Sequence, residues 1–195
     1  MAGKDLLKRG FKAESERLAV EYRNKMSIHA CAPLCAFKLA EHLNIPIYSA
    51  TEFLNLPDEI ERLSDESFGW SALTMITGAN NRIIINNPYH SQARQQSDLM
   101  HELAHVICDH KQSLSKYDFE IPLGMRHFDE VQEEEAICLG ATLQITRPGL
   151  LWALKRNYTV DQIANHFNSS VDMATYRIRM TGVAKQRGYS SKLSA

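Results

Sequence analysis

Two histidines and a glutamate stand at a spacing that can bind a metal ion and use it in catalysis. The segment His101-Glu-Leu-Ala-His105 has the HExxH pattern. On a helix, residues four apart lie on one face, about 6 Å apart along the axis, so both imidazoles can reach one ion. Glu102 lies one step round the helix, close enough to act on a water molecule at that ion. The spacing predicts a zinc site with His101 and His105 as ligands and Glu102 as general base.

A catalytic zinc site needs a third protein ligand, because zinc in such sites takes three side chains and leaves its fourth position to water. The next acidic segment is Glu133-Glu-Glu135. Glu135 falls on one helical stripe with Val131, Cys138, Leu139 and Thr142, whereas Glu133 points away from that stripe. A carboxylate on an apolar face is costly unless it is paired or metal-bound. We therefore expect Glu135 to be the third zinc ligand.

Hydrolysis of an amide bond is the chemistry that this set of residues predicts. Zinc lowers the pKa of its bound water to about 7, so Glu102 can take a proton from that water and pass it to the leaving amine. Asp98 and Asp109 lie one turn from the histidines, where either can accept an imidazole N–H or remain an ordinary surface carboxylate. The candidates for stabilising the oxyanion are Tyr89, His90, Arg94, Tyr117 and His127.

Hydrophobic periodicity predicts the elements that position these side chains. Ser91 is expected to cap a helix that reaches about Asp109, and a second site helix is expected from Asp129 to about Ile145. The β-rich runs 72–77 and 82–86 flank turn residues and predict a hairpin. A short strand is expected in 44–48, and a solvated excursion in 58–66. Further helices are expected over 11–25, 37–43, 150–156, 160–167 and 171–183, with a boundary at 147–149.

These elements predict an α+β, zincin-like fold, in which a small, mostly antiparallel sheet packs on the HExxH helix and on a second, Glu-bearing helix. We expect residues 1–149 to form the metallopeptidase domain and residues 150–195 a helical extension. The chain has 195 residues, of which 44% are hydrophobic and 23% charged, as in ordinary globular proteins. It contains no apolar run long enough for a membrane span or a signal-peptide core, so we expect a cytoplasmic protein without a membrane partner.

The last 45 residues are basic, whereas the preceding part of the chain carries a net negative charge. Residues 163–178 resemble a helix-turn-helix, with the turn at 168–170. Tyr176, Arg177 and Arg179 would then be available on or near the second helix for contact with DNA or a partner protein. In the alternative interpretation, these helices pack on the catalytic domain and shape the substrate cleft.

Several segments beyond HExxH resemble one known family. Ala40-Glu-His-Leu-Asn-Ile-Pro46 is similar to the segment before that family's sheet, and residues 87–94 to its approach to the metal helix. Glu134-Glu-Ala136 with Leu139-Gly-Ala141 is similar to the helix that carries its third ligand. On these motifs the chain, from about Phe11 to Val183, resembles the ImmA/IrrE-type metallopeptidases. It departs from their pattern at Ile137, where the family commonly has Asn or Asp.

The resemblance implies a bacterial or mobile-element zinc peptidase, with Glu135 as its third ligand. It also implies a protein substrate, a helix-turn-helix repressor whose cleavage relieves transcriptional repression. An exposed edge of the hairpin in 72–86 offers a physical route, because it could bind an extended peptide as an added strand. The alternative is a regulator that binds DNA or holds a repressor, with a structural or non-catalytic metal site.

Overall fold

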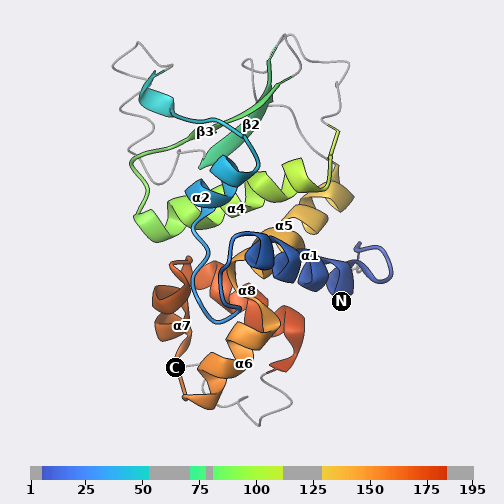
Figure 1. Ribbon diagram of the computed structural model, residues 1–195, viewed down its shortest axis with the longest axis vertical. Helices are drawn as coiled ribbons and strands as arrows, with labels where there is room; N and C mark the ends of the chain where they lie inside the picture. The colour runs from blue at the N-terminus through green and yellow to red at the C-terminus, as the bar shows by residue number, and fades with distance from the viewer. Residues whose placement is uncertain (1–5, 53–70, 78–80, 112–128, 184–195) are drawn as a thin grey trace.

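The computed structural model describes residues 6–52, 71–77, 81–111 and 129–183, and it has the expected α+β architecture (Figure 1). In Figure 1 the sheet lies at the top, helix α4 (Gln92–Ile107) runs beneath it, and α5 (Glu130–Gln144) and α1 (Phe11–Lys25) lie below α4. Helix α2 (Ala36–His42) packs against α4. The segment 58–66 lies outside the described residues.

Among the described residues, three strands form a sheet in the order β1-β3-β2. Strands β2 (Ala72–Ile76) and β3 (Arg82–Asn86) pair antiparallel, with Leu73 opposite Ile85, which confirms the two predicted strands. Strand β1 (Ile47–Ser49), followed by the 3-10 turn η1 (Ala50–Glu52), pairs parallel to β3. Within the described sheet, β3 is central and β2 is an edge strand.

The two helices that carry the acidic and histidine motifs begin at side-chain caps. The hydroxyl of Ser91 accepts a hydrogen bond from the backbone N–H of Arg94 at the start of α4. The carboxylate of Asp129 accepts one from the N–H of Gln132 at the start of α5. Each cap satisfies a backbone donor that the first helical turn cannot pair internally, so both predicted helix starts are confirmed.

The main core joins α1, α2, the sheet, α4 and α5. Its fully buried side chains include Leu39, Ile84, Leu99, Leu103 and Leu139. On the α1 side, the buried guanidinium of Arg23 donates to the last carbonyls of α5, at Leu143 and Gln144. A cation at a helix C-terminus satisfies carbonyls that have no partner inside the helix. The ends of α5 are therefore fixed by Asp129 at one end and by α1 at the other.

A second apolar cluster lies among the C-terminal helices α6 (Arg147–Lys155), α7 (Val160–Phe167) and α8 (Val171–Thr181). Helix α6 begins earlier than expected, because Thr146 caps it and Pro148 falls in its first turn, where a proline costs no hydrogen bond. The break between α5 and α6 therefore falls at 145–146 rather than at 147–149. The division into domains 1–149 and 150–195 stays a prediction. None of the described helices combines the length and the apolar character that crossing a bilayer requires.

Candidate metal centre

The imidazoles of the HExxH motif face one another on α4. His101 Nε2 and His105 Nε2 lie 3.1 Å apart, with the rings at a steep angle to one another. His105 is buried, whereas His101 is about one quarter exposed. The helical spacing thus brings the two ring nitrogens together as the sequence predicted.

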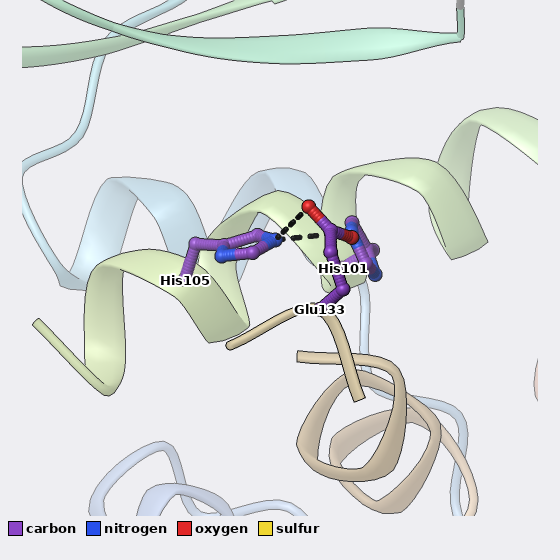
Figure 2. A group of neighbouring side chains, drawn as sticks. All are labelled: His101, His105 and Glu133. Carbon is purple, nitrogen blue, oxygen red and sulfur yellow. Dashed lines mark hydrogen bonds and ion pairs between the residues drawn. The ribbon is translucent and has the colours of Figure 1, made fainter. Parts of the chain in front are cut away.

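Glu133, at the start of α5, completes the group (Figure 2). Its carboxylate oxygens lie 3.3 Å from His101 Nε2 and 3.7 Å from His105 Nε2. Glu135, which was expected to be the third ligand, lies elsewhere: its Oε2 is 3.1 Å from His110 Nε2, and its Oε1 is 3.2 Å from Lys8 Nζ. The structure therefore places Glu133, rather than Glu135, beside the two imidazoles.

Helix α5 is buried on two faces, and this explains the difference. The stripe that carries Glu135 and Cys138 faces α1, where Cys138 Sγ lies 3.8 Å from Ser15 Oγ. The face of Glu133 continues through Ala136 and Gly140, and at Gly140, which has no side chain, α5 lies against the backbone of Met100 and His101 on α4. Apolar periodicity identified the face against α1. The small residues mark the face against the metal helix.

The donor set and the spacing of the three side chains fit a divalent metal ion. Two imidazole nitrogens and one carboxylate are a recurring ligand set of catalytic zinc. Tetrahedral zinc with bonds of about 2.0–2.1 Å requires ligand atoms roughly 3.3 Å apart. The ligand atoms here lie within 4.8 Å of one another, and the closest contacts are 3.1 and 3.3 Å. His101, His105 and Glu133 can therefore hold such an ion with little movement.

The electrostatics of the group are those of a carboxylate held between two imidazoles. The imidazole of His101, at 3.3 Å, and behind it that of His105, at 3.7 Å, hold the pKa of Glu133 far below its ordinary value, so the carboxylate is ionised. Burial lowers the pKa of His105. Burial also lowers the pKa of His101, but the hydrogen bond with Glu133 and the charge of Glu102 outweigh it, so that this pKa ends above its ordinary value.

Glu102 lies on α4 beside the group and is held by the sheet. Its Oε2 accepts a hydrogen bond of 2.6 Å from the hydroxyl of Thr74 on β2, and both side chains are buried. Burial raises the pKa of Glu102, while the charge of His101 and the Thr74 hydrogen bond oppose that rise. A carboxylate with a raised pKa binds a proton more readily, as a general base must. Thr74 was not among the site residues predicted from the sequence.

His110 is a further residue that the sequence analysis missed. Its Nδ1 lies 2.9 Å from Nδ1 of His105, on the opposite side of that ring from Nε2. The signal was present in the sequence, because a third histidine follows His105 by five residues. It was overlooked because five residues exceed one helical turn, and the contact depends on how α4 ends.

Among the described residues, the other sequence candidates make their hydrogen bonds and ion pairs outside the group of His101, His105 and Glu133. Asp98 Oδ2 is 3.4 Å from Nδ1 of the buried His90, and Asp109 forms an ion pair with Arg82. Tyr89 is exposed, while Arg94 Nη2 donates to Ser71 Oγ at 3.2 Å. Tyr117 and His127 lie outside the described residues.

A cavity of about 530 Å³ opens beside His101. Its walls come from α4, from Ile137 on α5, and from the first turns of α8, including Asp172, Met173 and Tyr176. A larger cavity, of about 780 Å³, lies at the C-terminal end of α4 and is lined by none of His101, His105 and Glu133. The smaller cavity is the one adjacent to the candidate metal centre.

The C-terminal helices are tied to the rest of the chain by polar contacts. Ser97 Oγ on α4 accepts from the N–H of Ser170, and Arg177 Nε donates to the carbonyl of Ile145 at 2.7 Å. Arg177 also pairs with Glu16 on α1 and is buried. The expectation that Arg177 is available on the helix surface was wrong, because this side chain packs the helix onto α1 and α5.

Comparison with known proteins identifies one family. The family model described as the IrrE N-terminal-like domain, a peptidase family, matches residues 51–179. This range contains β2, β3, α4 and α5, and with them all the side chains of the candidate metal centre. No curated protein and no solved structure is significantly similar to the chain.

Proposed function

The chain belongs to the peptidase family of the IrrE N-terminal-like domain, and on this premise we propose that it is a zinc-dependent endopeptidase that cuts a protein partner. The observation that carries the proposal is the convergence of His101, His105 and Glu133, with Glu102 next to them on the same helix. These three side chains would hold the ion. When bound, zinc would polarise the scissile carbonyl and lower the pKa of a water ligand to about 7.

Glu102 supplies the proton transfers of the reaction. Its buried carboxylate takes a proton from the attacking water and delivers it to the amine of the leaving peptide, which departs as a neutral group. The hydroxyl of Thr74 holds one carboxylate oxygen at 2.6 Å, which leaves the other to face the reacting atoms. A positioned general base of this kind contributes about 10²–10⁴ in rate.

The sheet edge and the smaller cavity favour an extended peptide as substrate. Strand β2 is an edge of the described sheet, and its Thr74 contacts Glu102 directly. A substrate added as a further strand along β2 would therefore pass close to the general base. The cavity beside His101 would receive a side chain of that peptide, with Ile137 and Met173 as apolar wall.

A helix-turn-helix repressor is the proposed partner, on the strength of the resemblance to ImmA/IrrE-type peptidases. A repressor encoded next to this chain would be the first candidate substrate. The buried Arg177 weighs against the alternative of a DNA-binding regulator, because one of its basic side chains is used for packing.

The test compares the zinc-loaded protein with its Glu102→Gln variant on such a repressor, with cleavage followed by mass spectrometry. We expect a defined cut by the wild type, and stoichiometric zinc without cleavage in the variant. Glu134→Gln is the matched control, because Glu134 precedes Glu135 on α5 but is not among the clustered ligand atoms. A wild type that binds no divalent metal, or a Glu102→Gln variant that cuts at the normal rate, would overturn the proposal.

A further inference from the structure

We infer that His110 and Glu135 are positioning residues that hold His105 in the one tautomer whose Nε2 can bind a metal ion. The inference rests on the metal site of the proposed function. Three buried side chains form the chain of contacts: His105 Nδ1 lies 2.9 Å from His110 Nδ1, and His110 Nε2 lies 3.1 Å from Glu135 Oε2. Each contact is within hydrogen-bond distance.

The protons on His105 and His110 can be assigned in turn, starting from the carboxylate of Glu135. The carboxylate of Glu135 lies between the ammonium of Lys8, at 3.2 Å, and Nε2 of His110, at 3.1 Å, and a carboxylate beside an ammonium acts as an acceptor. Nε2 of His110 therefore carries the proton that it donates to Glu135. A neutral imidazole has one protonated nitrogen, so Nδ1 of His110 is then an acceptor. His105 must therefore donate from Nδ1, and its Nε2, which faces His101 and Glu133, is left without a proton. A metal ion can bind Nε2 only in that form of the ring.

The end of α4 places His110 in this position. The N–H of His110 bonds to the carbonyl of His105, and the N–H of Asp109 to that of Val106, while Asp109 has a positive φ of 52°. This is the Schellman arrangement, which turns the chain back over the last helical turn and brings its final residue against the one five positions earlier. That contact is usually apolar. Here it joins two imidazoles, with ring centroids 5.0 Å apart.

Strand β3 holds the same turn from the outside. Arg82 Nη1 donates to the carbonyl of Val106 at 3.0 Å, and the guanidinium also pairs with Asp109. A residue other than glycine in the left-handed conformation is unfavourable, and Asp is among those that tolerate it best. The turn is thus fixed by backbone bonds and by an ion pair. This gives His110 a defined position relative to His105.

The same contacts explain why the carboxylate of Glu135 can be buried. A carboxylate this deeply buried is costly without partners. His110 Nε2 supplies a hydrogen bond to Oε2, and the ammonium of Lys8 lies 3.2 Å from Oε1. Metal-binding histidines commonly donate their second N–H to a carboxylate, which fixes the ring and its tautomer. In this protein His110 lies between His105 and Glu135, so the carboxylate fixes the tautomer of His105 through His110.

The first experiment uses substitutions at His110 and measures zinc affinity by competition with a chelator. His110→Phe retains the ring volume but removes both nitrogens, and we expect zinc affinity to fall about 10–100-fold. His110→Gln carries one acceptor and one donor, so it can accept from His105 and donate to Glu135. We expect it to restore affinity to within a few-fold of the wild type. Glu134→Gln, on the same helix as Glu135, is the control and should bind zinc normally.

Two spectroscopic readouts separate positioning from general damage. The visible spectrum of the Co²⁺-loaded protein should change in His110→Phe and return toward that of the wild type in His110→Gln. In the zinc-loaded wild type, long-range ¹H–¹⁵N spectra of the imidazoles should show His105 protonated at Nδ1 and His110 protonated at Nε2. This second measurement needs no variant, so it decides the matter even where His110→Phe does not fold.

The inference would be overturned by spectra that show the opposite tautomers or a doubly protonated His110. It would also be overturned by a folded His110→Phe variant whose zinc affinity and Co²⁺ spectrum are unchanged. Its failure differs from that of the proposed function. A wild type that binds no zinc removes the metal site itself. If the wild type binds zinc and the His110→Phe variant binds it with the same affinity, the peptidase proposal stands and only the positioning role is removed.

Discussion

Gly140 on α5 touches the backbone of His101 on α4. A β-carbon at Gly140 would stand 3.1 Å from both the amide nitrogen and the Cα of His101, and 2.9 Å from the carbonyl oxygen of Met100. Backbone atoms cannot give way as a flexible side chain does. Because Glu133 lies two turns earlier on the same face of α5, this close approach sets how near the carboxylate comes to the imidazoles.

Gly140→Ala should therefore weaken metal binding as well as stability. The added methyl group forces α4 and α5 apart, at a cost of about 1–3 kcal/mol in the free energy of unfolding. The same displacement should lower zinc affinity, measured by chelator competition. Gly149→Ala is the matched control, since its β-carbon would meet the carbonyl of Ala30 at 2.9 Å, away from the site. It should lower stability but leave zinc affinity unchanged, and equal losses of affinity in both variants would contradict the argument.

Much of the fold could be predicted because its signals are local. The hydroxyl of Ser91 and the carboxylate of Asp129 each act within a few positions of the chain. Helix starts and strand limits were therefore confirmed to within a few residues. The start of α6 was predicted three residues too late, because the Pro-Gly pair after Arg147 suggests a break. In the structure Thr146 caps the helix, and the pair lies in its first turn.

The third member of the candidate site could not be found by periodicity alone. A helix buried on one side has one apolar stripe, but α5 packs against both α1 and α4. The sequence correctly predicted that Glu135 is buried, but burial alone does not identify the side chains that it contacts. Only the packing of three helices distinguishes it from Glu133. The role of His110 was equally hidden, since it depends on the backbone turn after Ile107.

Replacing Glu133 should remove zinc-dependent stabilisation. An ion held by His101, His105 and Glu133 links α4 to α5, so ligand binding to the folded state raises the melting temperature. At a zinc concentration of 1,000 times the dissociation constant, the stabilisation is about 4 kcal/mol. Glu133→Ala should abolish this shift in calorimetry. Because the substitution also removes the carboxylate that lies beside His101 and His105, the shift is measured against the metal-free form of each variant.

Glu134→Ala serves as the control for this experiment and should retain the full zinc-dependent shift. Glu135→Ala distinguishes the two glutamates. It should weaken zinc binding through His110 and still leave a measurable shift at higher zinc concentration. A normal shift in Glu133→Ala together with its complete loss in Glu135→Ala would show that Glu135 is the ligand.

Cys108 should be an unreactive thiol at neutral pH. Burial, with the charge of Glu135 as the next contribution, raises its pKa to about 11. A raised pKa favours the neutral thiol, so at pH 8 the thiolate fraction is about one hundredth of that of a thiol with a pKa of 9. Alkylation by iodoacetamide, followed for the Cys108 peptide by mass spectrometry, should accelerate about tenfold per pH unit up to about pH 10.

Denatured protein provides the reference, because there the same peptide should approach its maximum rate near the ordinary thiol pKa. Glu135→Gln provides a second check. Removing the negative charge should shift the alkylation profile of Cys108 to lower pH. A native profile that levels off below pH 9 would contradict the predicted pKa.

Arg177 should contribute to stability rather than to DNA binding. Its guanidinium joins the carbonyl of Ile145, at the end of α5, to Glu16 on α1. Arg177→Ala leaves that buried carbonyl and the carboxylate without this partner, at a cost of about 2–4 kcal/mol in the free energy of unfolding by urea. Arg179→Ala is the matched control on the exposed side of α8, where the expected change is within about 0.5 kcal/mol. An Arg177→Ala protein that keeps its stability and loses affinity for duplex DNA would contradict the assignment and favour the recognition role of α8.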